Sequence, residues 1–142
     1  MSRVVSVART WIGTPYMHGA SVRGAGCDCL GLLRGVWREL EGCEPEDIPA
    51  YSPDWAESGG QERLLEAGLR HLCLATEEAE GQLLAFRMRC GAVAKHVGIQ
   101  SRVGPEAAFI HAYSGHGVVE SALTAPWRRR IATRFELEER IG

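Results

Sequence analysis

The spacing of apolar residues changes character near the middle of this 142-residue chain. In the first half apolar residues recur at helical intervals, most clearly in the stripe of Leu32, Leu33, Val36, Trp37 and Leu40. In the second half they form short or alternating runs typical of strands, at 82–88, 96–101, 107–113, 117–121 and 131–137. Helices followed by antiparallel strands predict an α+β fold, with N-terminal helices packed on a C-terminal sheet.

Three helices and two long loops are expected in the first half. Ser2 is placed to cap a short amphipathic helix over 3–12, the apolar stripe predicts a helix over 29–41 that Gly42 ends, and 61–70 favours a third. The glycines and small residues of 16–26 indicate a tight surface loop. The prolines, glycines and aromatics of 43–60 indicate a long ordered loop or flap.

Length and composition indicate one globular domain spanning 1–142. Apolar residues make up 45% and charged residues 24% of the chain, as in ordinary globular proteins. A net charge of −2 gives nucleic-acid binding little support, and the basic run Arg128, Arg129, Arg130 is interpreted as a solvated or protein-contacting surface. No apolar stretch has the length of a signal peptide or a membrane span, so we expect cytoplasmic synthesis without a signal peptide and no membrane insertion.

One of the five cysteines lies where a nucleophile gains reactivity. The odd number and the absence of a spaced framework favour reduced thiols. Cys29 opens the helix predicted over 29–41, and the partial positive charge and N–H groups of a helix N-terminus lower a thiol pKa. The same N–H groups suit a tetrahedral oxyanion. The alternative is that Cys29 is a small buried apolar residue, as most free cysteines are.

Two histidines on neighbouring predicted strands provide a base for this thiol. A hairpin connection at 103–106 pairs Val97 with Ile110 and sets His96 directly opposite His111. One imidazole then takes the cysteine proton and the other orients it. Hydrogen-bonded structural histidines are the alternative interpretation of each.

The same cysteines and histidines are also possible metal ligands. Two cysteines and two histidines are a possible tetrahedral zinc set, formed by Cys27, Cys29, His96 and His111. The Cys-x-Cys spacing argues against it, because a helix that starts at Cys29 aims the two sulfur atoms apart. We therefore expect no metal and no cofactor.

Four motifs follow one another in the order seen in a known family. They are residues 11–16 (WIGTPY), 28–32 (DCLGL), 96–99 (HVGI) and 109–112 (FIHA). On these motifs the chain resembles the NlpC-type cell-wall cysteine peptidases, which have a trimmed papain-like fold. The resemblance implies that Cys29 is the nucleophile, His96 the general base and His111 the residue that orients it.

The resemblance also implies roles for the loop that precedes the nucleophile. Tyr16 would place its hydroxyl in the catalytic cleft near the oxyanion, and Asp28 would shape the substrate side. His18, close behind Tyr16, is a further candidate for lining the site. From the residues alone Asp28 is equally a helix N-cap.

The subgroup that the chain looks most like is found in the tails of phages and phage-derived gene transfer agents. Residues 86–88, 91–99 and 51–55 carry this likeness. It implies assembly with tail hub or tail tip proteins and action on the cell wall of a target cell. Two departures concern substrate preference: Leu30 follows the cysteine where many members have serine, and Gly81-Gln82 replaces Gly-Asp.

The resemblance implies hydrolysis of an amide bond in peptidoglycan stem peptides, the bond between D-glutamate and diaminopimelate that this family usually cuts. Two other functions fit the sequence. In the first, the chain would be mainly a structural tail component with weak or vestigial activity. In the second, it would be an acyltransferase or amidase on the same fold.

Overall fold

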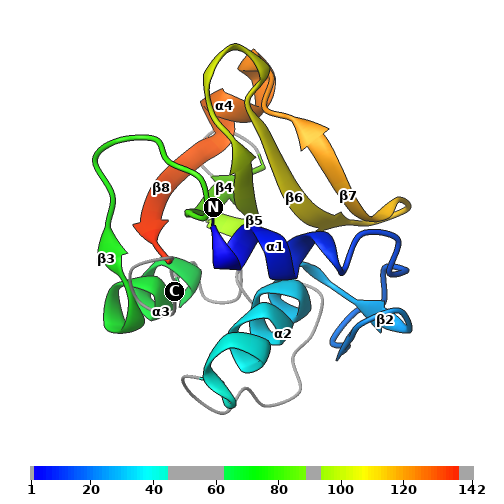
Figure 1. Ribbon diagram of the computed structural model, residues 1–142. Coiled ribbons are helices and arrows are strands. Elements are labelled where there is room, and N and C mark those ends of the chain that lie inside the picture. The colour runs from blue at the N-terminus through cyan, green and yellow to red at the C-terminus, as the bar shows by residue number, and fades with distance from the viewer. Residues whose placement is uncertain (1, 45–62, 89–93, 138–142) are drawn as a thin grey trace.

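Six strands form one antiparallel sheet with the order β3-β8-β4-β5-β6-β7. The computed structural model describes residues 2–44, 63–88 and 94–137. The sheet strands are β3 (Cys73–Leu74), β4 (Leu83–Arg87), β5 (Ala94–Arg102), β6 (Ala108–Tyr113), β7 (Gly117–Ala122) and β8 (Ile131–Glu136). Strand β8, from the C-terminal end of the described chain, therefore lies inside the sheet, between β3 and β4 (Figure 1).

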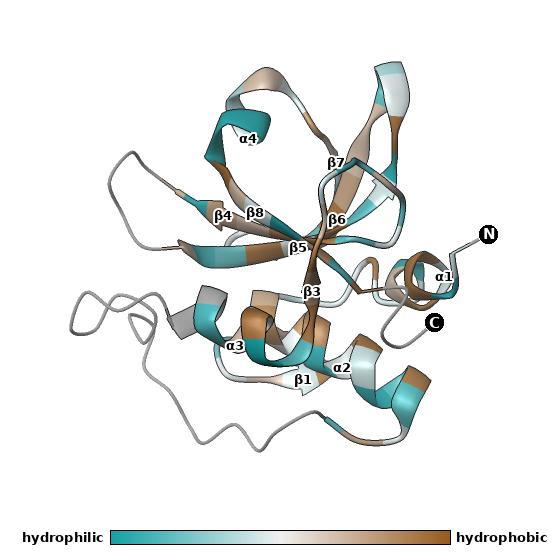
Figure 2. Cartoon of the chain, turned by 90° about the vertical axis from the view of Figure 1, so that its left-hand side faces the viewer, coloured by the Kyte–Doolittle hydropathy of each residue, from teal (hydrophilic) through white to brown (hydrophobic). Residues whose placement is uncertain are grey.

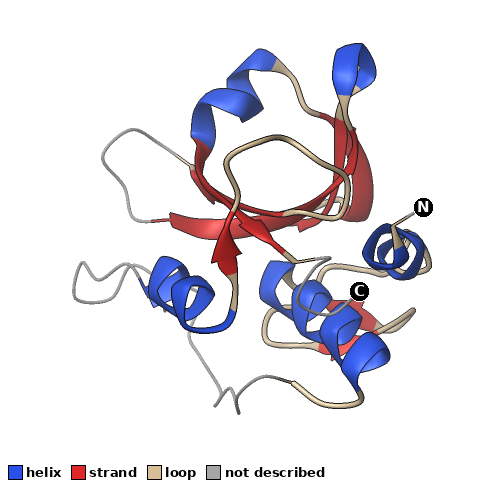
Figure 3. Cartoon of the chain, turned by 60° about the vertical axis from the view of Figure 1, so that its left-hand side comes forward, coloured by secondary structure: helices blue, strands red, loops and turns tan. Residues whose placement is uncertain are grey.

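The helices lie on both faces of this sheet (Figure 3). Those on one face are α1 (Arg3–Arg9), α2 (Cys29–Glu41) and α3 (Arg63–His71). The short α4 (Ala125–Arg130) lies on the other face. A second, two-stranded sheet joins β1 (Ser21–Val22) to β2 (Gly26–Cys27) just before α2. The predicted α+β architecture is confirmed.

Each face of the large sheet carries its own apolar core. The larger core contains Trp11, Val36, Val97, Ile110 and Phe135, and joins α1 and α2 to the sheet. The smaller one contains Leu84, Phe86 and Phe109 with Trp127 packed against them. Figure 2 shows the central strands as hydrophobic and α4 as mainly hydrophilic. Among the described residues, no helix is long and apolar enough to cross a membrane.

The predicted boundaries hold where the capping signals are strong. Helix α2 spans the predicted residues, because Asp28 caps its start and Gly42, at φ 85°, ends it in the left-handed conformation. Helix α1 stops at Arg9 instead of Ile12: the amides of Thr10, Trp11 and Ile12 bond to carbonyls three residues earlier, which tightens the chain into turns.

Several short elements were missed, and one loop lies outside the described residues. The predicted surface loop at 16–26 contains the β1–β2 hairpin, and β3 and α4 had not been expected. Two-residue strands and a six-residue helix rich in arginine carry no periodic signal. Of the loop predicted at 43–60, residues 45–60 lie outside the described part of the chain.

The predicted pairing of β5 with β6 is wrong by two residues. Ile99 pairs with Ile110, where the sequence-based register had Val97 opposite Ile110. A 3₁₀ helix at Gly104–Glu106 and an irregularity between Gln100 and Arg102 lengthen the connection. Because the shift is even, every side chain keeps its predicted face.

Helix α2 packs at a glycine against Trp11, in the turns that follow α1. A Cβ on Gly35 would lie 2.1 Å from Trp11 Cζ2, and the Trp11 side chain is 1% exposed. The absence of a side chain at Gly35 therefore lets the indole lie against the α2 backbone.

We expect Gly35→Ala to destabilise the protein by about 1–3 kcal/mol, the usual cost of overpacking. In an unobstructed helix the same change stabilises by about 1 kcal/mol, so the two effects differ in sign. Urea unfolding of the variant and the parent chain measures the difference. A rise in the free energy of unfolding would show that Trp11 does not constrain this position.

Candidate active site

A buried carboxylate sets the position of the candidate nucleophile. Asp28 is 3% exposed, and its Oδ1 accepts the Gly31 N–H at 2.7 Å while Oδ2 accepts the Gly19 N–H at 2.7 Å. The first bond caps α2 and the second ties down the preceding loop. Cys29 is thus the first residue of α2, as the sequence predicted.

The Cys29 sulfur lies against the segment of β5 that carries His96. Its thiol donates to the Lys95 carbonyl oxygen, with Sγ and O 3.8 Å apart, and the Val97 N–H is directed at the sulfur. The recorded β5–β6 pairs begin only at Ile99. The sulfur therefore lies on the side of β5 that pairs with β6 from Ile99 onwards.

The thiol pKa departs from the sequence-based expectation. Burial raises the pKa of Cys29 to about 11, although the N–H groups of Val97, Leu30 and Cys29 itself lower it. The helix N-terminus thus acts in the predicted direction, but the loss of solvation is the larger effect. The pKa of the thiol therefore lies above its ordinary value, opposite to the net lowering expected from the helix N-terminus alone.

The two predicted histidines are in direct contact. His96 Nε2 and His111 Nδ1 are 2.8 Å apart, with the rings at 78° to one another. They are not directly opposite, since a Cβ on Gly98 would lie 3.3 Å from His111 Cβ. Gly98 thus faces His111 across the strands, and the His96–His111 bond runs diagonally.

Both imidazoles are uncharged at neutral pH. His96 is 7% and His111 1% exposed. Burial, and the neighbouring charge of His111, lower the pKa of His96 to about 3; burial, and the charge of His116, lower that of His111 to about 4. In a neutral pair one ring donates to the other, and when His96 Nε2–H is the donor, Nδ1 of His96 stays available as a proton acceptor.

Four aromatic side chains surround the histidine pair, and sequence analysis had not identified them. They are Phe86, Phe109, Tyr113 and Trp127. The Phe109 ring centroid lies 4.2 Å from that of His111, and the Trp127 centroid lies 5.9 Å from His96 and 5.3 Å from His111. Phe86 and Phe109 were visible as same-face neighbours of the histidines, but Trp127 reaches them from α4.

The loop residues predicted to line the site lie near the start of α2. The pKa of Tyr16 is raised by burial and by the charges of Cys29, Asp28 and Cys27, and its backbone forms a bridge with Cys27, two residues before the nucleophile. His18 Nδ1 is 3.7 Å from Asp28 Oδ2. Asp28 itself has the capping role that its position predicted.

Cys27 is separated from this chemistry. It is fully buried within the larger core, and burial raises its pKa to about 12. Within residues 2–44, 63–88 and 94–137, no group of three or more histidine, cysteine or acidic side chains is arranged to hold a metal ion.

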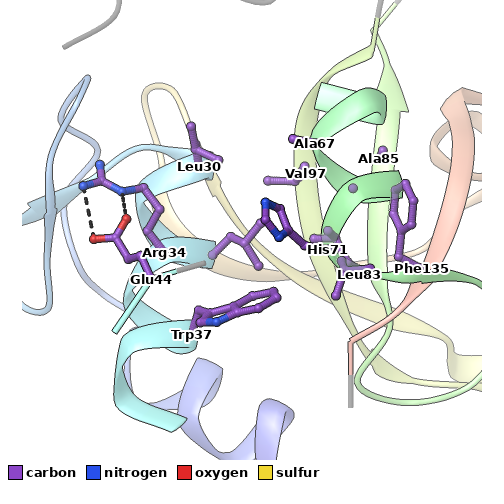
Figure 4. Close-up of a pocket in the computed structure, with 13 residues that line it drawn as sticks. Leu30, Arg34, Trp37, Glu44, Ala67, His71, Leu83, Ala85, Val97 and Phe135 are labelled. Carbon is purple, nitrogen blue, oxygen red and sulfur yellow. Dashed lines mark hydrogen bonds and ion pairs between the residues drawn. The ribbon is translucent and has the colours of Figure 1, made fainter. Parts of the chain in front are cut away.

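A largely apolar pocket adjoins the site between α2, α3 and the sheet (Figure 4). Its lining includes Leu30 and Val97, the residues that follow Cys29 and His96, together with Trp37. The ion pair of Arg34 with Glu44 closes one side, with Nε and Oε1 2.6 Å apart.

Comparisons with known proteins identify the fold. The chain matches no protein-family model and no curated protein. Among solved structures it is similar to the NlpC/p60 domain of the peptidoglycan hydrolase SagA, at 25% identity and a TM-score of 0.57 over 94% of this chain and 95% of that domain.

Two longer proteins are similar as well. An NlpC/P60 family protein from Bacillus cereus has 19% identity and a TM-score of 0.64 over 95% of this chain. A lipoprotein-like NLP/P60 family protein from Staphylococcus aureus has 19% identity and a TM-score of 0.60 over 94% of it. This chain spans only 39% and 40% of their respective lengths. The chain has the NlpC/P60 fold.

The buried histidines make stability sensitive to acid. Their folded pKa values lie below about 6.5, the value in an unfolded chain. The stability they contribute is therefore fully present above pH 6.5 and is lost as the pH falls towards 4. We expect urea unfolding at pH 5 to show a loss of up to about 2 kcal/mol per histidine relative to pH 7.5. His111→Gln should remove about half of this loss, and an unchanged pH dependence in that variant would contradict the assignment.

Proposed function

We propose that this chain is a cysteine peptidase that hydrolyses amide bonds in the stem peptides of bacterial peptidoglycan. The observation that carries the proposal is the Cys29 sulfur at the start of α2, against the β5 segment whose His96 is bonded to His111. The likeness to the NlpC/p60 domain of a peptidoglycan hydrolase supports the substrate class.

The reaction would proceed through a thioester. His96 takes the thiol proton as Cys29 Sγ attacks the carbonyl carbon, so the thiol need not be ionised before the attack. The C–N bond then breaks, and the leaving amine takes the proton from His96. Water, deprotonated by the same imidazole, attacks the thioester and releases the carboxylic acid and the free thiol.

The groups around the sulfur suit the charge that develops on the carbonyl oxygen. The N–H groups of Cys29 and Leu30 lie at the start of α2, where a helix presents unpaired donors. The Tyr16 hydroxyl, whose pKa the charge of Cys29 helps to raise, would supply a further donor. His18, whose Nδ1 lies 3.7 Å from Asp28 Oδ2, would be a further residue of this loop that lines the substrate site.

We propose the bond between D-glutamate and diaminopimelate as the one cleaved, on the resemblance of the four motifs. Neither departure from the family pattern changes the nucleophile or the two histidines. Gln82 is 1% exposed and bonds to the Glu77 carbonyl and to Arg134, so its role is structural. Leu30 lines the apolar pocket beside the nucleophile.

Delivery by a phage-like tail completes the proposal and rests on the resemblance to the tail-associated subgroup. The chain would be assembled with tail hub or tail tip proteins inside the producing cell and would act on the wall of a target cell.

The catalytic part is tested with Cys29→Ala and the matched control Cys73→Ala, whose cysteine is exposed on β3. We expect Cys29→Ala to lower the release of peptides from purified peptidoglycan by about 10³-fold or more, the usual effect of losing a nucleophile, and Cys73→Ala to leave it unchanged. Mass spectrometry of the products decides the reaction, because hydrolysis adds water and acyl transfer adds an amine. Equal product from Cys29→Ala and the parent chain would overturn the proposal.

Delivery is tested in the producing organism with the same substitution. If the chain is a tail-borne enzyme, Cys29→Ala particles should form in normal number and penetrate recipient cells poorly. Electron microscopy counts the particles, and transfer of a genetic marker measures penetration. Failure of these particles to assemble would favour a mainly structural role.

A further inference from the structure

We propose that Ser121 is a positioning residue for His96 and acts through His111. Its hydroxyl oxygen accepts the Nε2–H of His111, and this bond selects the tautomer of both imidazoles that leaves His96 Nδ1 as the base. The catalytic meaning of this inference rests on the proposed function, whereas the tautomer selection itself does not.

Three polar side chains on adjacent strands form one continuous hydrogen-bonded line. His96 Nε2 lies 2.8 Å from His111 Nδ1, and His111 Nε2 lies 3.0 Å from Ser121 Oγ. The residues come from β5, β6 and β7 in that order. All three lie on the face of the sheet that carries Phe109, because Ser121 pairs with Phe109 in the β6–β7 register.

The stagger of the strands makes Ser121 the polar partner that His111 meets on β7. In the register, Val119 lies directly opposite His111 on β7, and Gly98 faces it on β5. Neither residue has a polar side chain. Ser121, one diagonal step along β7, therefore lies where its hydroxyl meets the second nitrogen of His111.

Within this hydrogen-bonded line, the tautomer of one imidazole determines the tautomer of the other. Each neutral imidazole has one N–H donor and one acceptor nitrogen. If Ser121 Oγ accepts from His111 Nε2–H, then His111 Nδ1 must accept, and it accepts from His96 Nε2–H. His96 Nδ1 is then left with a lone pair. If His111 carried its proton on Nδ1 instead, both His96 nitrogens would be engaged or protonated and the base would be lost.

Ser121 is placed to act as the acceptor. It is half-buried at the outer strand β7, and it also lines a shallow hollow with Thr124 and Glu106 between the 3₁₀ helix and the end of β7. The hydroxyl hydrogen can therefore point towards that hollow, so that an oxygen lone pair faces the imidazole of His111.

The test compares Ser121→Ala with Ser121→Thr and with Ser101→Ala. Ser101 is a matched control, because its buried hydroxyl also joins two strands, donating to Glu120 Oε2 at 2.6 Å, without contacting a histidine. Long-range ¹H–¹⁵N correlation spectra of the full chain report the tautomer of each imidazole. We expect a single tautomer for His96 and His111 in the parent chain, mixed tautomers in Ser121→Ala, and the parent pattern in the other two variants.

Kinetics with peptidoglycan fragments give a second readout. Loss of one hydrogen bond to the imidazole line should lower kcat of Ser121→Ala about tenfold with KM changed less than twofold, and Ser121→Thr should restore it. Unchanged imidazole spectra in Ser121→Ala would overturn the inference, as would the same spectral change in Ser101→Ala. If no variant or parent cleaves peptidoglycan, the proposed function fails while the spectra still decide the role of Ser121.

Discussion

The buried carboxylate of Asp28 is the constraint on which the arrangement around Cys29 depends. Its two oxygens accept backbone N–H groups from both sides of the nucleophile, Gly31 within α2 and Gly19 in the preceding loop. A carboxylate that is 3% exposed is costly unless such charge-assisted bonds compensate it. The same contacts require a glycine at 31, since a Cβ there would lie 1.9 Å from the Ala20 carbonyl oxygen. The start of α2 and the preceding loop are therefore held in one relative position, which also fixes the position of the Cys29 sulfur.

The Cys29 sulfur lies beside a part of β5 that pairs with β4 but not with β6. Residues 94–99 of β5 pair with β4, but the recorded pairs with β6 start at Ile99. The Lys95 carbonyl and the Val97 N–H, on the side of β5 away from β4, meet the Cys29 sulfur. The strand thus presents backbone groups to the nucleophile while the intervening His96 side chain lies on the sheet face that carries Phe86 and Trp127. One stretch of backbone thereby positions both reacting groups.

How far the sequence predicts this structure depends on whether a feature is local. The bounds of α2 follow from Asp28 and Gly42, which act on their own helix, and the fold class follows from the change in periodicity. The β5–β6 register does not follow, because a 3₁₀ helix at Gly104–Glu106 leaves no periodic signal. The even shift still preserved the His96–His111 contact.

Features set by tertiary packing lay beyond the sequence. The helix N-terminus at Cys29 can be predicted from the sequence, but the burial that raises the pKa of Cys29 depends on a strand whose Lys95 is 66 residues away. Trp127 reaches the histidines from a helix with three arginines in its last turn, a pattern that indicates solvent exposure. Ser121 meets His111 only because of the stagger between β6 and β7.

The position of β8 inside the sheet has a consequence for the order of folding. Residues 131–136 are made after every other strand of the described sheet, yet they pair with both β3 and β4, and β4 in turn supports β5. A nascent chain that has not yet released these residues from the ribosome leaves one side of β4 unpaired. The sheet is complete only when residues 131–136 have left the ribosome, so the thiol and its base reach their final arrangement only after β8 has been made.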